Sequence, residues 1–145
     1  MDDLQKIFLS SEGRLNRLQY FKFTMILIIV ETVANSIFSD DYGNISDNLD
    51  MLITLAFLVP EYFLNVRRIH DFAGDEILAK LMVALTFYSM VFNSGADNMY
   101  MSDNLSFGDF LSSMPMDFYV YSALWFYLLF NPGTKGANQY GDEPL

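Results

Sequence analysis

The sequence predicts an all-α protein, an integral membrane four-helix bundle that forms a single domain over residues 1–145. Hydrophobic residues make up 52% of the chain and charged residues only 18%, whereas about a quarter of a soluble domain is charged. Lys and Arg are absent from 23–66 and from 81–134. A soluble bundle places such residues along the exposed face of every helix, so this pattern favours lipid.

Four apolar segments follow one another along the chain, and each predicts a membrane-spanning helix. A helix needs roughly 20 residues to cross about 30 Å of hydrocarbon. The first two segments approach that length, and the last two are shorter but carry aromatic residues suited to the membrane interface. The predicted spans are 20–38, 49–66, 77–92 and 117–131, with short ordered or amphipathic elements on the cytoplasmic side.

The basic residues predict how the bundle is oriented. All eight lie before or at the start of the first segment, around the junction of the second and third, or after the fourth, whereas the charged residues of the loops 39–48 and 93–116 are all acids. The positive-inside rule then places both termini and the central loop in the cytoplasm. The start of the chain lacks the basic region of a cleavable signal, so we expect the first segment to remain. The basic residues are Lys6, Arg14, Arg17, Lys22, Arg67, Arg68, Lys80 and Lys135.

Composition excludes several kinds of site. The chain has no cysteine, which excludes disulfides, thiolate metal sites and cysteine nucleophiles. Its formal net charge is −10, and this argues against nucleic acid as a partner because a phosphate backbone requires a basic surface.

A basic and aromatic stretch precedes the first predicted span. Arg14 and Arg17 are three residues apart and would share a helix face, and Tyr20 and Phe21 stand where an aromatic belt would begin. Such a stretch is typical of an anchor that touches anionic lipid head groups. A specific phosphate or partner site is the alternative interpretation.

A second polar motif follows the second predicted span and contains Arg67, Arg68, His70 and Asp71. On a continued helix Arg67 would face Asp71, with Arg68 also near it. The only histidine beside an aspartate allows a proton-transfer pair, but no serine or cysteine nucleophile accompanies it. A hydrogen bond at a helix end is the plainer interpretation, and we expect no catalytic residue here.

The C-terminal tail is rich in turn-forming residues. Pro132 and Gly133 would end the last helix, and Gly136, Asn138 and Gly141 suit positive backbone angles in consecutive turns. We therefore expect a structured loop that folds back onto the cytoplasmic face. It lacks the Gly-Lys-Ser/Thr ending of a phosphate-binding loop.

Together these three stretches resemble the bacterial inner-membrane family called domain of unknown function 805. One departure is that Phe72-Ala73-Gly74-Asp75-Glu76 replaces the family's small-residue stretch ending in Ser-Gly-Trp. The resemblance implies a multi-pass, four-helix fold in the bacterial inner membrane and implies no activity. The matching residues are Gly13, Arg14, Arg17, Tyr20 and Phe21 at the entry; Arg67, Arg68, His70 and Asp71 in the centre; and Gly133, Gly136, Asn138, Tyr140, Gly141 and Pro144 in the tail.

Glu31, Glu61 and Pro60 lie well inside the predicted spans. Glu31 and Glu61 fall at similar predicted depths, and a charge there is costly unless it is paired or protonated. Lys80 is the nearest cation in depth, so we expect a Glu61–Lys80 contact. Pro60 removes one backbone hydrogen bond and predicts a kink. The pair is interpreted either as an interhelical polar clamp or as an ion or proton site.

The second outer loop offers two further patterns. An amphipathic piece is expected near 105–114. The spacing of Met99 with Met101 and of Met114 with Met116 would suit a soft Cu(I) site, but methionine is also ordinary interfacial filler. We therefore expect no metal and no cofactor.

Three functions from different classes fit the sequence. The first is a non-enzymatic membrane adaptor that holds a protein partner or anionic lipid through the cytoplasmic motifs. The second is an oligomeric pore or ion or proton conductor that uses Glu31, Glu61 and Lys80, and it requires self-association. The third is a lipid-head-group enzyme that uses His70 and Asp71.

Overall fold

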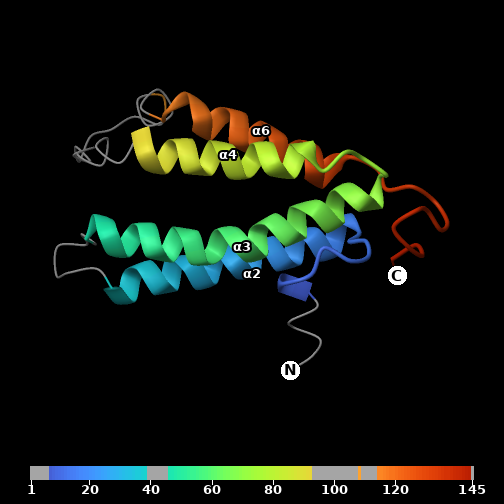
Figure 1. The fold of residues 1–145 in the computed structure, drawn as a ribbon, viewed down its shortest axis with the longest axis horizontal. Helices are drawn as coiled ribbons and strands as arrows, with labels where there is room; N and C mark the ends of the chain where they lie inside the picture. Colours follow the sequence, from blue (N-terminus) through green and yellow to red (C-terminus); the bar gives the residue numbers. More distant parts are fainter. Residues whose placement is uncertain (1–6, 39–45, 93–107, 109–113, 145) are drawn as a thin grey trace.

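The computed structural model describes residues 7–38, 46–92, 108 and 114–144 (Figure 1). Within these residues the chain forms four α-helices and no β-strand, apart from an isolated bridge between Asn138 and Gly141. The all-α prediction is therefore confirmed. The expected amphipathic piece near 105–114 and the Met99–Met101 pair lie outside the described residues, except for isolated positions.

The four helices agree closely with the predicted spans. They are α2 (Arg17–Phe38), α3 (Asp47–Asp71), α4 (Ile77–Phe92) and α6 (Met116–Phe130). Helices α2 and α3 are long and apolar enough to cross a membrane, and α4 and α6 are shorter apolar helices. The main difference is that α3 continues five residues beyond 66, so the Arg-Arg-x-His-Asp motif forms its last helical turns rather than a loop.

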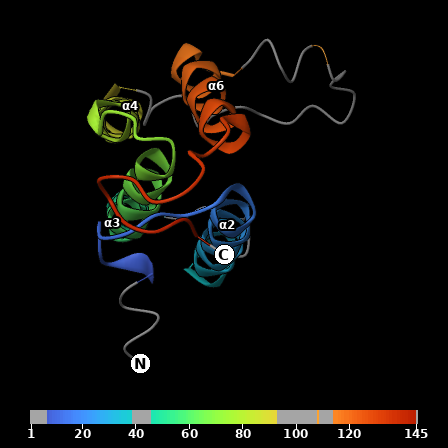
Figure 2. The same cartoon turned by 90° about the vertical axis from the view of Figure 1, so that its right-hand side faces the viewer.

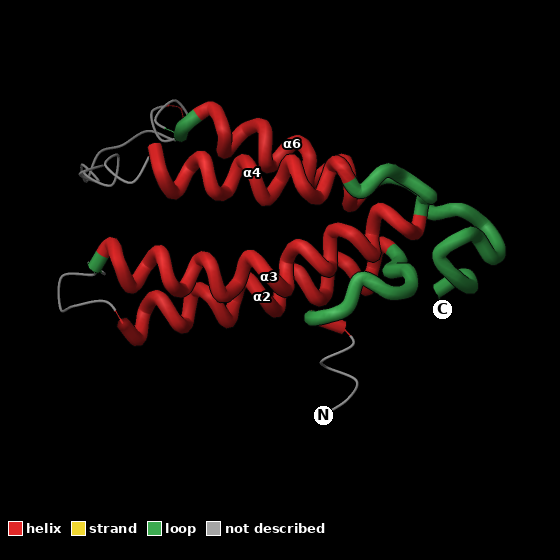
Figure 3. Tube along the Cα trace, in the orientation of Figure 1, coloured by secondary structure: helices red, strands yellow, loops and turns green. Residues whose placement is uncertain are grey.

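The helices form two antiparallel pairs, α2 with α3 and α4 with α6 (Figures 1 and 2). Helix α3 contacts each of the other three. At one end of the bundle α2 and α4 begin and α3 and α6 end, and the C-terminal tail lies across this end (Figure 3). We call it the terminal end and the opposite one the distal end.

The buried core lies in the half of the bundle next to the terminal end. The chain leading into α2, the last turns of α3, the first turns of α4 and the last turns of α6 contribute to it. Its fully packed members are Leu15, Tyr20, Leu64, Val66, Ile69, Ala79, Met82 and Leu128.

The distal half instead exposes its apolar side chains. Phe92 at the end of α4 is 70% exposed and Met116 at the start of α6 is 76% exposed. Helices that are apolar on all sides occur in protein cores or in membranes, and these side chains have no core to enter. The exposed surface of the distal half is therefore largely apolar.

Three hydroxyl groups of α2 form hydrogen bonds within the helix. The hydroxyl groups of Thr24, Thr32 and Ser36 on α2 each donate to the carbonyl four residues earlier, at 2.8 Å. Such bonds remove the cost of an unpaired hydroxyl in an apolar medium. Helix α3 passes through Pro60 without ending, and its second half turns toward α4 in Figure 3.

Candidate functional site

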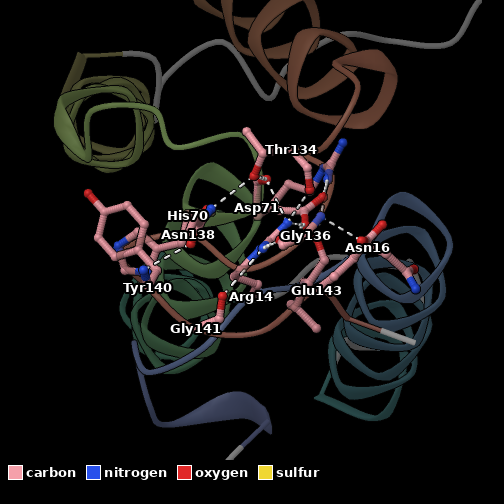
Figure 4. A network of polar contacts seen from close by, with 12 residues as sticks. Arg14, Asn16, His70, Asp71, Thr134, Gly136, Asn138, Tyr140, Gly141 and Glu143 are labelled. Carbon is pink, nitrogen blue, oxygen red and sulfur yellow. Dashed lines mark hydrogen bonds and ion pairs between the residues drawn. The ribbon is translucent and has the colours of Figure 1, made fainter.

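Asp71, the last residue of α3, is the centre of a buried polar network at the terminal end (Figure 4). Its carboxylate accepts hydrogen bonds from Nη2 of Arg14 at 3.0 Å and from Arg68. Its backbone carbonyl accepts from the amide and the hydroxyl of Thr134, at 2.8 and 2.9 Å. We call Arg14, Arg68 and Asp71 the arginine clasp.

Arg14 joins the N-terminal segment to the tail. Its guanidinium donates to the carbonyl oxygens of Thr134 and Gly136 at 2.6 Å each and of Gly141 at 3.4 Å. The side chain is almost completely buried. Because Arg14 also holds Asp71, a single side chain connects three stretches that lie more than 50 residues apart in the sequence.

Arg68 has a parallel role on the other side of Asp71. It is fully buried and donates from Nε to the carbonyl of Leu128 at 2.8 Å, and from Nη2 to the carbonyl of Asn131. The last carbonyls of a helix have no partner within it, so Arg68 caps α6 and complements its dipole. Its Nη1 also reaches the carbonyl of Leu15 at 3.2 Å.

The two buried guanidiniums have little capacity left for an outside ligand. In each of them all three nitrogens donate to groups of this chain. Buried charges persist when they are paired and hydrogen-bonded in this way. The structure thus uses Arg14 and Arg68 to hold the terminal end together.

Arg67 differs from its neighbour. The prediction that Arg67 faces Asp71 is wrong, because Arg68 and Arg14 occupy that carboxylate. Arg67 instead turns toward the N-terminal segment, where its Nη1 donates to the carbonyl of Ile7 at 3.1 Å.

His70 lies beside the clasp without joining it. Its Nε2 is 3.1 Å from a carboxylate oxygen of Glu76, and its ring stacks on Tyr140 with the centroids 3.7 Å apart. Asn138 donates to the His70 carbonyl at 2.9 Å. The carboxylate partner of His70 is therefore Glu76, and the His70–Asp71 proton-transfer pair considered from the sequence does not form.

The tail folds back onto the terminal end as expected. Gly136 and Gly141 have φ values of +75° and +131°, a region that favours glycine. Asn138 does not adopt the positive φ expected of it, because among the described residues other than glycine only Ala73 has a positive φ. Asn138 stabilises the turn through its side chain, whose oxygen accepts from the amide of Tyr140 at 2.9 Å.

Gly133 marks the closest approach of the tail to α3. A Cβ atom at this position would collide with the carboxylate of Asp71. Since the clasp holds that carboxylate from two sides, it has no room to move away. Pro144, the last tail residue of the predicted set, is partly buried.

The predicted Glu61–Lys80 contact is wrong. Glu61 faces α6, where it accepts a hydrogen bond from the hydroxyl of Tyr121. Lys80 lies in the first turn of α4, near the terminal end, and its ammonium is 3.7 Å from Glu76. Glu61 precedes the end of α3 by ten residues, about 15 Å along a helix, so the two groups differ in depth more than expected.

A cavity of about 710 Å³ opens among the four helices. Sequence reasoning found Glu31 and Glu61 but missed the cavity that contains both. One signal was available, because Thr24, Ile28 and Glu31 recur at helical spacing on α2 and Thr54, Leu58 and Glu61 recur on α3. The residues that line the cavity are Thr24, Met25, Leu27, Ile28, Glu31, Thr54, Phe57, Leu58, Glu61, Leu85, Thr86, Ser89, Pro115, Asp117, Phe118, Tyr121, Ser122, Trp125 and Phe126.

Comparison with known proteins supports the resemblance seen in the motifs. No curated protein and no solved structure matches the chain. A family model described as a protein of unknown function, DUF805, matches residues 8–142 and so includes the clasp, the stacked histidine, the cavity and the tail. The chain belongs to the DUF805 family.

Proposed function

We propose that this chain is a multi-pass protein of the bacterial inner membrane, with both termini in the cytoplasm, and that it is a non-enzymatic adaptor whose cytoplasmic face binds anionic lipid. The proposal rests chiefly on one observation, the division of the basic residues into a buried and an exposed set. Arg14 and Arg68 are buried in the clasp. The exposed set surrounds the terminal end.

The exposed set consists of four basic side chains that extend from different places on the protein surface. Arg17 and Lys22 lie in the first turns of α2, Lys80 in the first turn of α4, and Lys135 in the tail. The side chain of Lys80 is 63% exposed. Long basic side chains at helix ends reach the head-group region, and each one near an anionic surface contributes about 1 kcal/mol of attraction.

Lipid retention tests this proposal. The full chain is reconstituted with equal amounts of phosphatidylglycerol and phosphatidylcholine, and the lipids that remain bound are identified by native mass spectrometry. We expect retention of phosphatidylglycerol, and its loss when Arg17, Lys22, Lys80 and Lys135 are all replaced by Gln. A control variant with Lys22→Arg, Lys80→Arg and Lys135→Arg should behave like the parent.

Equal retention of both lipids by the parent, or unchanged retention by the Gln variant, contradicts the lipid proposal. If the Gln variant instead loses a co-purifying membrane protein, the same cations bind a protein partner.

The proposed orientation has its own test, which the lack of cysteine in the chain makes direct. A single Lys135→Cys substitution provides one exposed thiol in the tail. We expect an impermeant maleimide to label it in inside-out vesicles and to leave it unlabelled in intact spheroplasts. The reverse pattern would place the tail outside the cytoplasm.

Conduction by an oligomer is the second candidate, and the presence of Glu31 and Glu61 in one cavity favours it. Within a single copy, the buried core that includes Leu64 and Leu128 lies between the cavity and the terminal end. A continuous path therefore requires several copies. Glu61→Gln should reduce proton or potassium flux into liposomes, and the absence of flux from the parent protein excludes this function.

A further inference from the structure

The cavity in the bundle has an unbalanced charge. Its lining includes three carboxylates, Glu31, Glu61 and Asp117, and none of the described lining residues is Lys, Arg or His. Glu31 lies on α2 and Glu61 on the neighbouring helix α3, and both line this one cavity. Because an uncompensated charge in hydrocarbon is costly, the cavity is electrostatically complementary to a cation.

The walls of the cavity are mainly apolar, with aromatic rings from α3 and α6. These rings are Phe57, Phe118, Tyr121, Trp125 and Phe126. Aromatic faces attract organic cations and pack against their apolar parts. The combination of carboxylates with aromatic walls suits a cation that carries its own hydrophobic body better than it suits a hydrated metal ion.

One hydrogen bond at the cavity orders a carboxylate. Tyr121 donates to one carboxylate oxygen of Glu61 and so fixes the orientation of that side chain. The volume of about 710 Å³ falls within the range of small-molecule sites, about 300–1,000 Å³.

We propose that this cavity binds a hydrophobic organic monocation, whose charge lies between Glu31 and Glu61 and whose apolar body packs against the aromatic walls. This site is independent of the lipid contacts proposed for the terminal end. A lipid acyl chain is the competing occupant, but it carries no positive charge to pair with the carboxylates.

The binding test uses two probes of nearly equal size and opposite charge, tetraphenylphosphonium and tetraphenylborate. The chain contains one tryptophan, and Trp125 lines the cavity, so its fluorescence reports occupancy directly. The full chain is titrated in a neutral maltoside detergent, and equilibrium dialysis of the phosphonium gives a second measure. We expect saturable binding of the phosphonium only.

Substitutions then assign the site. Glu31→Gln breaks none of the hydrogen bonds described above and should weaken phosphonium binding about tenfold or more, as expected when one member of a buried charge pair is removed. Glu61→Gln should do the same, whereas Asp142→Asn, in the exposed tail, should have no effect. Similar binding of both probes, no saturable binding, or unchanged phosphonium affinity in Glu31→Gln overturns the proposal.

Discussion

The two halves of this bundle are built from the same four helices but differ in the interactions that hold the helices together. At the terminal end, the buried side chains of Arg14, Arg68 and Asp71 are joined by charged hydrogen bonds. Arg14 also binds backbone carbonyls of the tail. At the distal end, apolar residues cover the outside and a cavity of about 710 Å³ separates the helices.

This difference indicates where the uniqueness of the fold originates. Packing of apolar helices in lipid is weakly directional, because lipid tails are as apolar as the side chains. The charged clasp has a fixed geometry and leaves a costly unpaired group if any member is displaced. A terminal end with fixed geometry therefore allows the distal end to remain open, as the cavity shows.

Replacing Asp71 should have the largest effect on stability. Asp71→Asn removes the counter-charge of two buried arginines, and such a loss costs about 3–5 kcal/mol. Thermal unfolding in detergent should show a large fall in midpoint relative to the control Asp142→Asn. A midpoint equal to that of the control contradicts a structural role for the clasp.

Gly133→Ala should have the next largest effect, because the added Cβ would collide with the Asp71 carboxylate. Overpacking of this kind costs typically 1–3 kcal/mol. The same unfolding assay detects the change, and Ala137→Ser, at an exposed tail position, is the matched control. Equal stability of the two variants would show that the tail does not pack closely on α3.

Loss of the stacked ring should loosen the tail more than the bundle. Tyr140→Ala removes the contact with His70, and aromatic pairs of this kind contribute about 0.5–1.5 kcal/mol. Hydrogen exchange should accelerate in the tail after residue 133 and remain unchanged in α3. Tyr140→Phe keeps the ring and should exchange like the parent, and faster exchange in that variant as well would assign the effect to the hydroxyl.

A polar contact in the distal half should contribute least. Tyr121→Phe removes the hydrogen bond to Glu61, and interhelical hydrogen bonds in membranes average about 0.6 kcal/mol. We expect a small fall in the unfolding midpoint, well below that of Gly133→Ala. A fall as large as that of Asp71→Asn would mean that both halves of the bundle are locked to a similar degree.

The helices could be predicted from the sequence because each one is a separate apolar segment bounded by charges or turn residues. The fold-back of the tail was also predictable, since Gly136 and Gly141 have few roles other than turns. Local patterns of this kind depend on neighbouring residues only.

The partners of the charged residues could not be predicted in the same way. Helical spacing makes Arg67 and Arg68 nearly equivalent neighbours of Asp71. The choice of Arg68 follows from the carbonyls of Leu128 and Asn131, which are distant in the sequence. Depth estimates alone likewise could not show that the hydrogen-bond partner of Glu61 is Tyr121 of α6 and not Lys80.

Cysteine accessibility tests the contrast between the two halves most directly. Ser122 lines the cavity, whereas Ala79 is fully buried in the terminal half, and the chain contributes no other thiol. Each is replaced by Cys and treated with the cationic reagent methanethiosulfonate ethyltrimethylammonium, because only an accessible thiol reacts. We expect rapid modification of Ser122→Cys and none of Ala79→Cys. Equal rates at the two positions would contradict a closed terminal half and an open distal cavity.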